Sequence, residues 1–156
     1  MLEIDIPGFG LVQAEHLVSD FTGTLSLDGK LLAGVEKRLQ ALSEILKLHI
    51  VTSDTFGLAR SELRSVECTL NILSGVDHDL LKESYVKNLG PEKVIAIGNG
   101  KNDSYMLKAA RIGIAVSEGE GCAVRALKNA DIHVRSIGEG LDLLVHPDRL
   151  KATLRY

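Results

Sequence analysis

Short apolar runs alternate with amphipathic stretches along the chain. The runs that predict strands lie at residues 11–19, 48–51, 66–73, 93–97, 112–116 and 131–134. The stretches with apolar residues at helical spacing lie at residues 33–47, 57–65, 79–89, 104–110, 122–130 and from 141 onward. This alternation predicts an α/β fold in three layers, in which a parallel, Rossmann-like sheet carries helices on both faces. Because polar and apolar residues alternate within 66–73, this strand is expected at an edge.

Two hairpins are expected outside this pattern. Residues 2–6 alternate apolar and acidic side chains before the turn at residues 7–10, which predicts an N-terminal hairpin that leads into the first core strand. The Asp28-Gly29 pair lies in the alternating segment 25–31 and predicts a second hairpin. This small hairpin is expected to form a flap over Asp20.

Length and composition exclude several classes of protein. The 156 residues predict one domain, 1–156, and the net charge of -3 gives no general attraction to nucleic acid or acidic membranes. No apolar run is long enough to span a bilayer, and the acidic N-terminus does not resemble a signal peptide, so a cytoplasmic protein is expected. Cys68 and Cys122 are interpreted as reduced, with a disulfide as the minor alternative, and the histidines show no metal-ligand spacing.

The chemistry is expected to centre on Asp20. An apolar run ends at this residue, and Thr22, Gly23 and Thr24 then favour an abrupt turn. The carboxylate is therefore expected to be exposed at the carboxyl end of a buried strand, which is where open α/β sheets bind ligands. A carboxylate in such a position can act as a nucleophile and form an acyl-phosphate. The simpler alternative is that Asp20 only opens a turn.

Polar clusters follow the other predicted strands and can converge with Asp20 at the same edge of a parallel sheet. These clusters contain Thr52 with Ser53, the helix that carries Lys82, and Asn99 with Asn102 and Asp103. Phosphoryl transfer to a carboxylate requires a nucleophile, a hydroxyl donor, a cation and a divalent ion that neutralises phosphate oxygens. The clusters supply candidates for each of these roles.

Three motifs carry a family resemblance. The segment Asp20-Phe21-Thr22-Gly23-Thr24-Leu25 resembles the Asp-Lys-Thr-Gly-Thr-Leu phosphorylation motif of P-type ATPases, which are members of the haloacid dehalogenase-like (HAD) superfamily. Residues 52–54 (Thr-Ser-Asp) are similar to the family's Thr-Gly-Asp, and residues 98–103 (Gly-Asn-Gly-Lys-Asn-Asp) to its Gly-Asp-Gly-x-Asn-Asp. The motifs occur in the family's order, and the resemblance covers residues 17–131.

The resemblance implies roles for these residues. Asp20 is the expected nucleophile in a catalytic set with Thr22, Thr52 and Lys82. The implied cofactor is Mg²⁺, which would be held by Asp20, the Thr22 carbonyl and Asn99 or Asp103. The residues expected to bind the phosphate are Thr52, Ser53, Lys82 and Asn102. Lys82 fits the Lys-x-x-x-Val spacing of the pumps, Lys87 is the second candidate, and a solvated helix face is the alternative for either lysine.

Two positions and one absence shape the expected activity. Asn99 stands where the family usually has a metal-binding aspartate, which predicts weaker Mg²⁺ binding. Thr22 stands where HAD phosphatases have a second aspartate as general acid/base, so hydrolysis of an aspartyl-phosphate is expected to be slow. The chain has no room for the membrane, nucleotide-binding or actuator parts of a pump. A capless site is therefore expected, open to a large substrate or closed by a second subunit in a homo-oligomer.

The sequence thus predicts a Mg²⁺-dependent phosphohydrolase with an aspartyl-phosphate intermediate. Its substrate would be a phosphorylated small molecule or a phosphoprotein, with no nucleic-acid or membrane partner. The alternative from another class is a phosphoacceptor or interaction module with slow or no turnover. A receiver domain is disfavoured because its acidic metal pair precedes the phosphorylated aspartate, and an inactive relic would depend on Asn99 alone.

Overall fold

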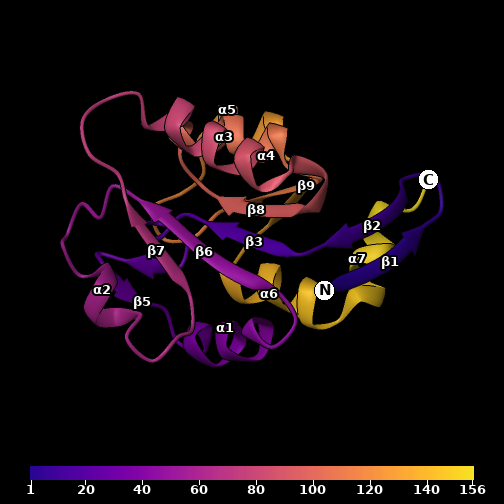
Figure 1. Ribbon diagram of the computed structural model, residues 1–156, viewed down its shortest axis with the longest axis horizontal. Coiled ribbons are helices and arrows are strands. Elements are labelled where there is room, and N and C mark those ends of the chain that lie inside the picture. Colours follow the sequence, from indigo (N-terminus) through magenta and orange to yellow (C-terminus); the bar gives the residue numbers. More distant parts are fainter.

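A six-stranded parallel sheet forms the centre of the structure, a computed structural model that describes residues 1–156 (Figure 1). Its strands, from one edge to the other, are β10 (Ile132–Val134), β9 (Ile112–Val116), β8 (Val94–Gly98), β3 (His16–Ser19), β6 (Lys47–Thr52) and β7 (Thr69–Ile72). All five neighbouring pairs are parallel. The predicted α/β class is confirmed, and β7 lies at an edge as its alternating polarity predicts.

Helices cover both faces of this sheet (Figure 1). The helices on one face are α3 (His78–Leu89), α4 (Ser104–Ala109) and α5 (Val124–Asn129), and those on the other are α1 (Val35–Ser43) and α6 (Ile137–Val145). The short helix α2 (Ala59–Glu62) follows β6. Successive strand residues point to opposite faces, so Leu17 packs in the larger apolar cluster and Val18 in the smaller one. Full burial of each such side chain contributes about 1.5–3 kcal/mol.

Both predicted hairpins are present. β1 (Leu2–Ile6) and β2 (Gly10–Ala14) pair antiparallel and lie with α7 (Pro147–Leu154) and the C-terminus at one end of the molecule (Figure 1). β4 (Ser26–Leu27) and β5 (Lys30–Leu31) form the small hairpin. Asp28 and Gly29 between them have φ angles of 51° and 80°, the left-handed pair that a type I′ turn requires.

Helix boundaries differ most from the sequence prediction at the C-terminus. The helix expected from residue 141 onward is two helices, because Pro147 begins α7, where its missing N–H costs no hydrogen bond. The preceding helix α6 begins at Ile137, and the Ser136 hydroxyl caps it by accepting from the Glu139 N–H at 3.2 Å. None of the helices is both long and apolar enough to cross a membrane.

Candidate active site

The turn after β3 places Asp20 in the middle of the sheet's carboxyl edge. β3 lies between β8 and β6, and the Asp20 N–H continues the ladder by donating to the Ile97 carbonyl at 3.0 Å. The chain then folds back on itself, since the Phe21 carbonyl accepts from the N–H groups of Leu25 and Ser26 at 3.0 Å each. Asp20 is only 6% exposed. Asp20 thus lies at the end of a buried strand as expected, but the prediction that its carboxylate is exposed is wrong, because Lys82 packs against it.

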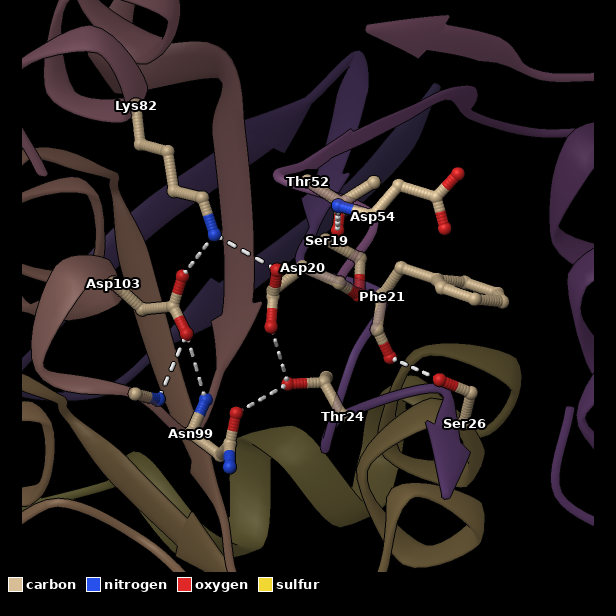
Figure 2. Close-up of polar contacts among 11 residues, drawn as sticks. Ser19, Asp20, Phe21, Thr24, Ser26, Thr52, Asp54, Lys82, Asn99 and Asp103 are labelled. Carbon is tan, nitrogen blue, oxygen red and sulfur yellow. Dashed lines mark hydrogen bonds and ion pairs between the residues drawn. The ribbon is translucent and has the colours of Figure 1, made fainter. Parts of the chain in front are cut away.

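Lys82 lies against Asp20, whereas Lys87 does not. From α3, the Lys82 ammonium contacts Asp20 Oδ1 at 2.8 Å and Asp103 Oδ1 at 2.7 Å, and its side chain is completely buried (Figure 2). Lys87 is 57% exposed on the same helix and pairs with Glu83. The structure thus brings Lys82, and not the second candidate, into contact with Asp20.

Both oxygens of the Asp103 carboxylate accept hydrogen bonds. Its Oδ1 accepts from Lys82, and its Oδ2 accepts from the backbone N–H groups of Asn99 at 3.0 Å and Gly100 at 2.8 Å (Figure 2). This arrangement ties Lys82 to the loop that follows β8. The expected role of Asp103 as a metal ligand stays a prediction.

Burial and charge shift the acid–base behaviour of this cluster. Burial, with a contribution from the Asp103 charge, raises the pKa of Asp20 to about 6, although Lys82 opposes the shift. Burial lowers the pKa of Lys82, but the carboxylates of Asp103 and Asp20 outweigh it and hold that pKa above its ordinary value. Lys82 therefore remains a cation, while Asp20 is the group that can take up a proton near neutral pH.

Oxygen atoms suited to Mg²⁺ converge beside Asp20. The Thr24 hydroxyl lies 3.5 Å from Asp20 Oδ2 and 3.2 Å from Asn99 Oδ1 (Figure 2). The Asn99 amide is held by its donation to the Gly121 carbonyl at 3.0 Å. The buried hydroxyl of Thr22 has no hydrogen-bond partner within the chain. Carboxylate, amide and carbonyl oxygens are the ligands that Mg²⁺ prefers. The residues therefore fit the ion, with one formal negative charge among Asp20, Asn99 and the Thr22 carbonyl.

The remaining predicted residues lie at or after the ends of β6 and β8, at the carboxyl edge of the sheet. Thr52 is buried at the end of β6, the neighbour of β3, and its hydroxyl oxygen accepts from the Asp54 N–H at 2.9 Å, which leaves the hydroxyl proton available. Ser53 follows it and is half-buried. Asn102 lines a hollow of about 370 Å³ together with Lys101 and the first residues of α3.

Sequence reasoning missed a row of three hydrogen-bonded side chains that joins elements of the site. His16 Nδ1 lies 2.9 Å from His49 Nε2, and His49 Nδ1 lies 2.9 Å from the Tyr85 hydroxyl. Burial, with the nearby charges of His16 and Lys47, lowers the pKa of His49 to about 4. This row links β3, β6 and α3, the three elements that carry or support Asp20, Thr52 and Lys82. Only the strand register reveals it, because both histidines lie in ordinary strand positions of the sequence.

Two comparisons of the sequence with known proteins give a match. Residues 79–135 match a family model described as haloacid dehalogenase-like hydrolase. A protein of Methanocaldococcus jannaschii, uncharacterized protein MJ0073, is 48% identical over 64 residues, which cover 41% of this chain and 69% of that protein. The region that the family model matches includes helix α3, which carries Lys82, and the loop that contains Asn99.

Solved structures show the same fold at low sequence identity. The 3-deoxy-D-manno-octulosonate 8-phosphate phosphatase of Moraxella catarrhalis, in complex with magnesium, phosphate and KDO, is 20% identical with a TM-score of 0.70, over 91% of this chain and 94% of that one. A phospho-aspartyl intermediate analogue of phosphoserine phosphatase is 16% identical with a TM-score of 0.62, over 85% and 99%. The fold is therefore that of the HAD phosphatases. The family model over residues 79–135 and this fold both support a hydrolase of the haloacid dehalogenase-like superfamily.

Proposed function

We propose that this protein is a Mg²⁺-dependent phosphohydrolase that forms an aspartyl-phosphate on Asp20. The observation that carries the proposal is the ion pair at 2.8 Å between Lys82 and Asp20 Oδ1, at the carboxyl edge of the sheet. It leaves Oδ2 with a single long contact, 3.5 Å from the Thr24 hydroxyl. One carboxylate oxygen is thus held by a cation, and the other is available to attack phosphorus.

Each residue has a defined task in this proposal. Asp20 Oδ2 attacks the phosphorus of a phosphate ester, the ester oxygen departs, and the acyl-phosphate remains. Lys82 offsets negative charge on the phosphoryl oxygens, and the Thr52 hydroxyl donates to one of them. Asp20, Asn99 and the Thr22 carbonyl would hold Mg²⁺, which when bound neutralises phosphate charge. Ser53 and Asn102 line the approach to the phosphate.

For the substrate, we propose only a chemical class. A phosphorylated small molecule or a phosphoprotein fits a site that is open because no cap domain follows the β4–β5 hairpin. The Moraxella neighbour acts on a phosphorylated octulosonate, which supports the small-molecule alternative only as a likeness of fold. The proposed similarity to P-type ATPases consists of the shared sequence motifs. We also propose that residues 1–156 act as one cytoplasmic domain whose site a second copy can close.

The second candidate function is a phosphoacceptor module. It is favoured by one observation, the threonine at position 22, which cannot serve as a general acid/base and would leave the acyl-phosphate long-lived. Steady-state turnover of a generic phosphate ester with and without Mg²⁺ distinguishes the two. Catalytic turnover that requires Mg²⁺ and disappears in Asp20→Asn supports the hydrolase, whereas a single phosphorylation event without turnover favours the module.

A further inference from the structure

The loop between β9 and α5 brings a glutamate to the edge of the site. A Cβ atom added to Gly23, in the turn after Asp20, would collide with Oε2 of Glu120 and would lie 2.7 Å from Nδ2 of Asn99. Glycine at position 23, with a φ angle of 77°, leaves this space to the two side chains. The Glu120 carboxylate therefore lies over the turn of the nucleophile and on the same side of it as Asn99.

The backbone of this loop is fixed from both sides. The Gly121 carbonyl accepts from the Asn99 amide at 3.0 Å, and the Ala123 N–H donates to the Asn99 carbonyl at 2.8 Å. On the other side, a Cβ at Gly119 would lie 3.0 Å from the Leu27 side chain of the β4–β5 hairpin. The loop that carries Glu120 is thus held by Asn99 and lies against the β4–β5 hairpin, although the Glu120 side chain is exposed to water.

Other carboxylates around the site are already engaged. Asp103 binds Lys82 and two backbone N–H groups. Asp54 accepts from the N–H groups that begin α2, and Glu118 accepts from the Ile137 N–H. Glu120 has an exposed carboxylate and contributes to no helix cap or ion pair at this edge of the sheet.

We propose that Glu120 is the catalytic base for hydrolysis of the aspartyl-phosphate, an inference that rests on the proposed function. In this step a water oxygen bonds to phosphorus, and the bond between phosphorus and the Asp20 oxygen breaks. Asp20 leaves as a carboxylate and inorganic phosphate is released. The proton of the attacking water passes to the Glu120 carboxylate and then to solvent. Glu120 thereby performs a task that Thr22 lacks the chemistry for.

The test is rapid-quench kinetics of wild type and Glu120→Gln with a chromogenic phosphate ester and Mg²⁺. Loss of a general base costs at least about 10²-fold in the step it serves, so the steady-state rate is expected to fall by that factor. The initial release of leaving group is expected to keep its amplitude and rate, because phosphorylation of Asp20 does not use Glu120. Glu120→Asp should recover part of the steady-state rate, and Glu44→Gln, a matched change at an exposed glutamate of the α1 terminus, should change neither phase.

Other outcomes overturn the inference in distinguishable ways. Equal steady-state rates in Glu120→Gln and wild type exclude the role while leaving the aspartyl-phosphate intact. A smaller initial phase, or weaker Mg²⁺ binding by calorimetry, would place Glu120 in phosphorylation or at the metal instead. Absence of both phases from the wild type would overturn the proposed function itself, and the role of Glu120 with it.

Discussion

Replacing Asp20 by asparagine should abolish activity and yet stabilise the metal-free fold. Burial beside Asp103 raises the pKa of Asp20 from 3.8 to about 6, and this value already includes the opposing attraction of Lys82. At about 1.4 kcal/mol for each pKa unit, the ionised Asp20 destabilises the folded state by about 3 kcal/mol near neutral pH. Asparagine has nearly the same volume and no charge, and it leaves Lys82 paired with Asp103.

The pH dependence follows from the sign of this shift. A carboxyl group whose pKa is raised on folding binds more protons in the folded state, so the wild type loses stability as the pH rises from about 4 to about 6. Below about pH 4 both variants are neutral at this position and should unfold alike. Above about pH 6 Asp20→Asn should be more stable by the full amount, which corresponds to a rise in Tm of roughly 6–12 °C for a domain of this size.

The assay is thermal or urea unfolding in buffer with a chelator, at about pH 4 and about pH 7.5. Asp5→Asn, which removes a carboxylate from the exposed side of β1, is the matched control and should change stability little at either pH. A wild type as stable as Asp20→Asn at neutral pH, or a difference that does not vary with pH, would refute the reasoning. It would mean that neighbouring groups such as Lys82 stabilise the ionised Asp20 carboxylate enough to offset the cost of burying it.

Three further predictions concern the chemistry. Lys82→Ala should lower turnover far more than Lys87→Ala, because only Lys82 contacts Asp20, and the reverse ranking in a phosphatase assay would reassign the role. Asn99→Asp should bind Mg²⁺ more tightly by titration calorimetry, because a hard cation gains an anionic ligand, and unchanged affinity would remove residue 99 from the ligand set. Thr22→Asp should raise phosphatase turnover by up to roughly 10²-fold if the new carboxylate reaches the water that attacks the aspartyl-phosphate, and a decrease would show that added charge near Asp20 disturbs the site instead.

Hydrophobic periodicity was sufficient for most of the fold. The apolar runs around Val18, Val51 and Ala96 are long enough to predict buried parallel strands, and the Asp28-Gly29 pair specifies the turn of the β4–β5 hairpin. The start of helix α6 was less predictable, because Gly138 and Gly140 interrupt its helical pattern. Glycine weakens the helix signal in a sequence, while tertiary packing against β9 and β10 overrides its low propensity.

The site was predictable only where motifs carry it. Asp20 and Lys82 are 62 positions apart, and their contact follows from family spacing together with the parallel sheet rather than from local pattern. The engagement of both Asp103 oxygens could not be predicted, because it depends on how the loop after β8 directs its N–H groups. Glu120 carries no motif at all, and only the close approach of its loop to Gly23 reveals it.

The central claim is that Asp20 carries the phosphoryl group, and trapping it tests this most directly. Acid quench during the initial phase of the reaction with a phosphate ester and Mg²⁺, followed by peptide mass spectrometry, should find one phosphoryl group per chain on the peptide that contains Asp20. The same peptide should be unmodified in Asp20→Asn, and leaving group should be released in a stoichiometric burst before slow turnover. Linear release from the first turnover with no phosphorylated peptide, or a phosphoryl group on another residue, would contradict the account.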